Sequence, residues 1–123
     1  MRDHEWCEGQ IFVFGSNLAG IHGAGAAAFA RKNCGARIGV GVGMTGESYA
    51  IPTKDENIET LDLKTIEGYV DEFLEFARKN PRKKFFVTRI GCGLAGYTDS
   101  QIAPMFTRVP PNCILPPEWD DVF

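Results

Sequence analysis

Two glycine-rich segments are the parts of this sequence best suited to bind a ligand. The first is 14–25 (FGSNLAGIHGAG) and the second is 90–97 (IGCGLAGY), and each follows an apolar run and leads toward a helix. Glycine lets the backbone approach a ligand closely, and a helix N-terminus offers unpaired N–H groups to an anion. The two segments together therefore predict a site for a diphosphate that needs no lysine.

Side chains able to transfer protons lie in or near these segments. His22 is either an ordinary loop histidine or a general acid or base, because imidazole titrates near neutral pH. Lys54 and Asp55 follow an apolar run and form either a solvated connection or an acid–base pair. Cys92 is better explained as a small residue beside a phosphate than as a nucleophile, since the sequence supplies no histidine partner.

Three larger side chains border the same segments. Phe14 and Tyr97 either stack on a base or ribose or belong to the core. Arg89 either faces a sheet edge or points toward a phosphate. Neither segment is a P-loop, since no Gly-Lys-Ser/Thr follows the glycines.

Composition excludes several classes of protein. The chain has 123 residues and a net charge of −3, which favours one globular domain and disfavours binding to duplex nucleic acid. No apolar run approaches the roughly 20 residues of a membrane span, and the N-terminus lacks the pattern of a secretory signal. Four cysteines and two histidines are not spaced as a zinc site, so we expect no metal, no cofactor and reduced thiols in the cytoplasm.

The elements that must position these residues alternate between strands and helices. Strands are expected at 11–14, 48–51 (ending at Pro52), 84–90 and around 113–115, with a loop or irregular strand at 39–46. Helices are expected at 26–32, 63–79 and, after an Asp99 N-cap, from 99 to 106. This order predicts a single α/β domain over 1–123 with a mostly parallel sheet.

The motifs resemble those of the macrodomains, a family that binds ADP-ribose and related metabolites. Residues 14–17 (FGSN) are similar to the family's Asn-Ala-Ala-Asn strand end, and 22–26 (HGAGA) to its first glycine loop. Residues 91–97 (GCGLAGY) resemble the second loop, which wraps the diphosphate, and 48–52 (SYAIP) fall at a central strand. The likeness is greatest to a compact branch of bacteria and phages, and it implies a three-layer α/β fold.

The resemblance also implies a set of ligand-binding residues in the two loops. They are Gly15, Ser16, Asn17, Gly23, Ala24, Gly25, Gly91, Cys92, Gly93, Leu94, Ala95, Gly96 and Tyr97. Asn17 corresponds to the asparagine that holds the distal ribose. The aspartate that reads adenine in the family has no clear counterpart, and Phe14 replaces the first asparagine of the motif.

The function implied is binding of ADP-ribose, free or attached to a protein. Hydrolysis of an ADP-ribosyl linkage or of ADP-ribose 1''-phosphate would use a water activated by substrate phosphate, with Asn17, His22 or Asp55 assisting. The alternatives are a non-catalytic module that sequesters a nucleotide signal and an interaction domain without a ligand. The sequence leaves the oligomeric state open.

Overall fold

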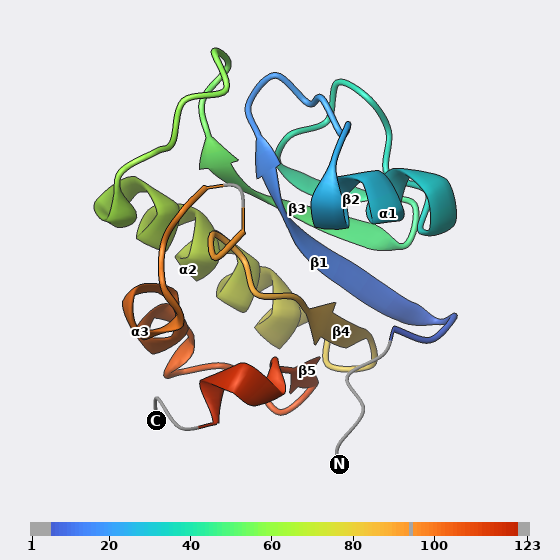
Figure 1. Ribbon diagram of the computed structural model, residues 1–123. Helices are drawn as coiled ribbons and strands as arrows, with labels where there is room; N and C mark the ends of the chain where they lie inside the picture. The colour runs from blue at the N-terminus through green and yellow to red at the C-terminus, as the bar shows by residue number, and fades with distance from the viewer. Residues whose placement is uncertain (1–5, 94, 121–123) are drawn as a thin grey trace.

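A five-stranded sheet with the strand order β2-β3-β1-β4-β5 organises the computed structural model, which describes residues 6–93 and 95–120 (Figure 1). The strands are β1 (Gln10–Asn17), β2 (Gly43–Thr45), β3 (Ser48–Lys54), β4 (Lys84–Val87) and β5 (Cys113–Ile114). All neighbouring pairs are parallel except β2 and β3. The predicted α/β class with a mostly parallel sheet is confirmed.

Helices cover both faces of the sheet (Figure 1). They are α1 (Gly25–Asn33), α2 (Leu63–Lys79) and α3 (Asp99–Ile102), with 3₁₀ turns η1 (Ala103–Phe106) and η2 (Pro117–Trp119). The chain leaves central β1 through α1 on one face and returns after β3 through α2 on the other. In open α/β sheets such a change of face creates a crevice at the carboxyl ends of the strands.

The alternation of side chains along β1 divides the core into two clusters. Ile11 and Val13 pack toward α2, and Phe12 and Phe14 pack toward α1. All four side chains are buried, so the apolar run of β1 is covered on both faces, as a central parallel strand requires. The strand is therefore a firm base for the polar residues at its carboxyl end.

Helix α2 matches the predicted range 63–79. One stripe of its side chains is buried, namely Ile66, Val70, Phe73, Leu74 and Ala77. Asp62 caps the helix, since its carboxylate accepts a hydrogen bond of 2.8 Å from the Thr65 N–H. No helix of the described residues is long and apolar enough to cross a membrane. The four cysteines form no disulfide.

Strand β3 continues through Pro52, where the sequence predicts an end. Pairing with β2 stops at Ala50, so no strand accompanies Pro52 on that side. A proline, which lacks an N–H donor, is tolerated where no ladder bond is needed. The register against β1 shifts between Ser16 and Asn17, close to the proline. The longer strand carries Lys54 to the same edge of the sheet as Asn17.

Two other predicted boundaries differ. Strand β4 ends at Val87 rather than at 90, because the Thr88 N–H and hydroxyl both bond the Val13 carbonyl and the chain then turns. The N-cap of α3 is Thr98 rather than Asp99, and the Thr98 N–H donates to the Gln101 side chain at 2.9 Å. The Asp99 carboxylate is thereby available for other partners.

Candidate functional site

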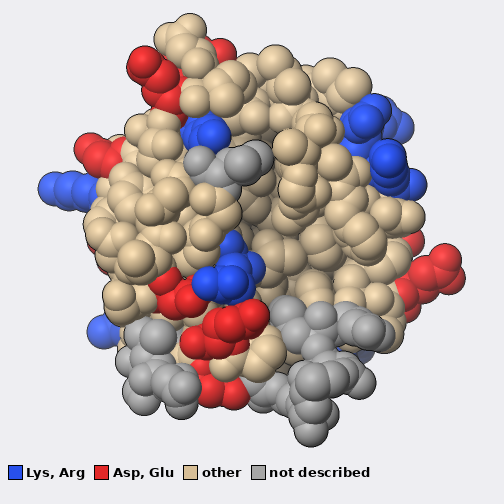
Figure 2. All heavy atoms as spheres, in the orientation of Figure 1, with Lys and Arg blue, Asp and Glu red and all other residues tan. Residues whose placement is uncertain are grey.

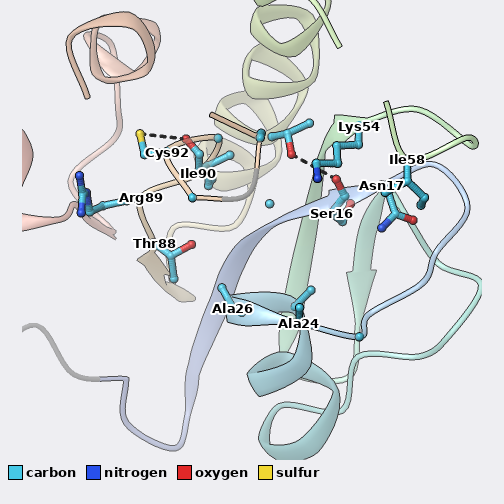
Figure 3. Close-up of a pocket in the computed structure, with 18 of the residues that line it drawn as sticks. Ser16, Asn17, Ala24, Ala26, Lys54, Ile58, Thr88, Arg89, Ile90 and Cys92 are labelled. Atoms are coloured by element: carbon cyan, nitrogen blue, oxygen red, sulfur yellow. Dashed lines mark hydrogen bonds between the residues drawn. The ribbon is translucent and has the colours of Figure 1, made fainter. Parts of the chain in front are cut away.

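A cleft of about 600 Å³ lies at the carboxyl ends of β1, β3 and β4, beside the N-terminus of α1. Figure 2 shows it as a hollow walled mostly by uncharged atoms, with Lys or Arg atoms at its edge. Its lining comes from three loops and one helix start (Figure 3). The lining residues are Gly15, Ser16, Asn17, Ile21, Gly23, Ala24, Gly25, Ala26, Ala27, Thr53, Lys54, Ile58, Thr88, Arg89, Ile90, Gly91, Cys92, Gly93 and Ala95.

The end of β1 forms the floor of the cleft. The buried Ser16 hydroxyl donates to the Gly41 carbonyl. The Asn17 amide donates to the Ile21 carbonyl at 2.8 Å, and its oxygen accepts from the Ile21 N–H at 3.0 Å. Gly41 is required beneath this loop, since a Cβ there would lie 2.2 Å from the Asn17 carbonyl oxygen. Asn17 therefore shapes the first loop, and these bonds use one of its two amide hydrogens.

The N-terminus of α1 opens onto the cleft without a side-chain cap. Ala24 occupies the N-cap position, and the first turn contains no acidic residue. The first N–H groups of a helix have no partner within it and carry a partial positive charge. Here those donors belong to Gly25, Ala26 and Ala27, which also line the cleft.

The second glycine loop faces the first across the cleft. Short turns build it: the Cys92 N–H donates to Arg89, the Gly96 N–H to Gly93 and the Tyr97 N–H to Gly91. Gly91 has a φ of +76°, and a Cβ there would lie 3.1 Å from Ile102. The close packing and the left-handed backbone together favour glycine at this position.

Two cationic side chains line the cleft, and they differ in their partners. Lys54 ends β3 and forms no ion pair with any residue that the structure describes. Arg89 forms two parallel hydrogen bonds with Asp99, Nε to Oδ1 at 3.0 Å and Nη2 to Oδ2 at 2.7 Å. These bonds hold the pKa of Asp99 below its ordinary value. No carboxylate belongs to the described lining, so the field in the cleft favours an anion.

Cys92 lines the cleft as an unreactive thiol. Burial, followed by the nearby Asp99 carboxylate, raises the pKa of Cys92 to about 12. Its sulfur lies 3.5 Å from the Ile90 carbonyl, to which the thiol donates. A thiolate is therefore scarce at neutral pH, which agrees with the interpretation of Cys92 as a small residue rather than a nucleophile.

His22 does not line the cleft. Its side chain is 2% exposed, its Nε2 lies 3.1 Å from the carbonyls of both Arg37 and Val40, and its ring packs edge-on against Phe14. Because both partners are acceptors, Nε2 carries the hydrogen. His22 therefore joins the loop after β1 to the loop after α1, and this structural role replaces the predicted acid–base role.

Asp55 also lies outside the lining. Its Oδ1 accepts from the N–H groups of Asn57 at 2.8 Å and Glu59 at 3.0 Å, which flank Ile58. Ile58 has a φ of +64°, an unfavourable conformation for a β-branched side chain, and it lines the cleft. Asp55 thus fixes the loop that presents Ile58, and the geometry gives it a positioning role instead of a catalytic one.

The remaining predicted ligand residues divide into those that line the cleft and those that do not. Gly96 and Tyr97 are not in the lining, and the Tyr97 hydroxyl donates to the Leu61 carbonyl at 2.6 Å. Leu94 falls outside the described residues. All the other predicted ligand residues line the cleft.

The sequence interpretation missed several lining residues: Ile21, Ala26, Ala27, Thr53, Ile58, Thr88 and Ile90. Most of them lie next to a residue that was predicted to belong to one of the loops, at the end of a strand or the start of α1. Their position in the sequence was therefore the signal that could have identified them as lining residues. Ile58 had no such signal. Its place depends on the turn that Asp55 organises between β3 and α2.

Comparison with known proteins adds no relative. No protein-family model, no curated protein and no solved structure matches this chain. The fold and the cleft therefore carry the functional argument.

Proposed function

We propose that this protein binds ADP-ribose or a related nucleotide-derived metabolite in the cleft. The observation that carries the proposal is the uncapped N-terminus of α1 facing the loop with Gly91 and Gly93 across a cleft that also holds Lys54, which forms no ion pair with a described residue. Helix N-terminal N–H groups and a lysine ammonium are both suited to phosphate oxygens. The resemblance to macrodomains supports the same ligand class.

The size and walls of the cleft suit a nucleotide-derived ligand. Small-molecule sites enclose roughly 300–1,000 Å³, and the cleft encloses about 600 Å³. Glycine and alanine form much of its wall, so backbone N–H groups can approach an extended anion closely. Asn17 lies at one end with a free amide hydrogen, which in this proposal binds a hydroxyl of the distal ribose.

Binding is the function that the geometry supports better than hydrolysis. The titratable side chains in the described lining are Lys54, Arg89 and Cys92, and the Cys92 thiol stays protonated at neutral pH. Hydrolysis would instead rely on a substrate phosphate as the base, with Asn17 orienting the water. The proposed ligands are a free metabolite or the same group attached to a protein in the cytoplasm.

Titration calorimetry with a lysine variant tests the proposal. Lys54→Met removes the unpaired cation while keeping most of the apolar stem, and we expect ADP-ribose to bind at least about ten-fold more weakly. Lys64→Met, on the exposed first turn of α2, is the matched control and should bind as the wild type does. Equal affinity in all three proteins would contradict an anion site at Lys54. Mass spectrometry of wild type with ADP-ribose 1''-phosphate then separates turnover from binding.

A further inference from the structure

The cleft offers a nucleobase no aromatic partner among its described lining residues. Phe14 is fully buried between the sheet and α1, and the Tyr97 hydroxyl is bonded to Leu61. Neither ring lines the cleft, although both were candidates for stacking. A base bound here must find another planar or apolar surface.

Arg89 supplies a planar group at the end of the cleft opposite Asn17. Figure 3 shows Arg89, Thr88 and Cys92 on one side and Asn17, Lys54 and Ile58 on the other. Ala24 and Ala26 at the start of α1, together with Ile90, lie between these ends (Figure 3). A ligand with a central diphosphate would therefore place one terminal group beside Asn17 and the other beside Arg89.

The plane of the Arg89 guanidinium is fixed from outside the cleft. Its Nε and Nη2 are both committed to Asp99, at 3.0 and 2.7 Å. Asp99 is held in turn by the Trp119 indole N–H at 2.8 Å, and Trp119 is fully buried against Phe106. The C-terminal turn η2 thus orients a side chain that remains 46% exposed.

These bonds to Asp99 use the Nε–Nη2 edge of the guanidinium and leave its two faces and Nη1 without a hydrogen bond to any described residue. Asp99 occupies one edge and offsets part of the charge, which makes Arg89 a weaker phosphate ligand than Lys54, a cation without an ion pair to any described residue. A guanidinium plane stacks well on aromatic rings. We propose that Arg89 binds the nucleobase of the ligand by stacking the plane of its guanidinium on the ring.

The inference rests on the proposed function and adds to it the class of base accepted. Stacking uses the π face that every base has, so it discriminates between bases weakly. The site should accept purine and pyrimidine nucleoside diphosphates, with the larger purine ring preferred.

The test compares ADP with inorganic pyrophosphate, which lacks the base, by calorimetry on the full chain. The wild type should bind ADP at least about ten-fold more tightly than pyrophosphate, as expected for one stacked base. Arg89→Lys keeps the positive charge and loses the planar guanidinium. The ratio of ADP affinity to pyrophosphate affinity should therefore fall at least about five-fold, while the pyrophosphate affinity itself stays within about two-fold of the wild-type value. Arg78→Lys is the matched control, because Arg78 is similarly exposed and is paired with Glu75 on α2. Arg78→Lys should leave the ratio of ADP affinity to pyrophosphate affinity unchanged.

Four results would overturn the inference. The first is that folded Arg89→Lys still binds ADP more tightly than pyrophosphate by the wild-type ratio. The second is that pyrophosphate affinity falls as much as ADP affinity does, which would show that Arg89 binds a phosphate. The third is that the wild-type protein binds ADP and pyrophosphate equally, which would refute the stacking role and leave the diphosphate site intact. This result is obtained without any variant. If neither compound binds, the inference fails, and titration with ADP-ribose then shows whether the proposed function fails with it.

Discussion

Ala24 begins α1 without a side-chain acceptor, so an aspartate at this position should stabilise the fold and weaken ligand binding together. The residue is exposed and has the extended backbone (φ −150°, ψ 161°) that an N-cap residue adopts. An aspartate can therefore accept a hydrogen bond from the first turn without rearrangement. The same carboxylate would stand where the proposal puts a ligand phosphate.

The two effects have predictable sizes. Replacing alanine by a good N-cap contributes about 1 kcal/mol, and the added charge at the helix N-terminus contributes about 0.3–1 kcal/mol more. For a chain of this length the two contributions together raise Tm by about 5–8 °C. A carboxylate about 5 Å from a phosphate charge costs about 3 kcal/mol at an effective dielectric constant of about 20. After screening by salt, at least about ten-fold weaker binding should remain.

Thermal unfolding and calorimetry on Ala24→Asp and Ala24→Asn separate the charge from the cap. Asparagine caps as well as aspartate does but carries no charge. Both variants should be more stable than wild type, and Asp should lose clearly more ADP-ribose affinity than Asn. Unchanged affinity in Ala24→Asp would refute the placement of an anion at this helix. A fall in Tm would refute the reading of Ala24 as an uncapped start.

Three further predictions concern the walls of the cleft. Gly91→Ala should lower the free energy of unfolding by about 1–3 kcal/mol, because φ is +76° and the new Cβ meets Ile102 at 3.1 Å; urea titration measures it. Because Arg89 lowers the pKa of Asp99, this pair contributes stability above the ordinary carboxylate pKa of 3.8 and loses it as the pH falls through the lower folded value. Unfolding curves between pH 2 and 6 should show a steeper acid loss for wild type than for Asp99→Asn. Ile58→Gly should relieve the strain at φ +64° and raise stability by about 1 kcal/mol while weakening ligand binding; a loss of stability would show that the isoleucine side chain contributes more than its strain costs.

Local sequence patterns predicted the bounds of an element correctly where the residues of that element alone determine them. The apolar stripe from Ile66 to Ala77 defines α2, and its bounds agree with the prediction because neighbouring strands do not alter them. The end of β3 was mispredicted because Pro52 stops a strand only when a neighbour needs its N–H, and that depends on where β2 ends. Where the pairing of two strands stops depends on the tertiary structure, and the residues of one strand alone do not determine it.

The same distinction explains the site. The glycine segments after β1 and β4 were predicted to meet, and Gly23, Gly25, Gly91 and Gly93 line one cleft because parallel strands end at the same edge. The chemistry assigned to His22 and Asp55 depended on where their side chains point, and both are engaged with loop backbone instead. Lys54 was left open between a solvated and a functional role, and its position follows from the longer β3.

Calorimetric titration of the wild-type protein with ADP-ribose tests the central claim most directly. The arrangement of α1, the Gly91–Ala95 loop and Lys54 predicts saturable binding with one site per chain and a Kd in the micromolar range or tighter. Affinity should fall as salt is added, because the proposed contacts are mainly to phosphate. An absence of binding to ADP-ribose, NAD and ADP-ribose 1''-phosphate would contradict the claim and leave only the α/β fold.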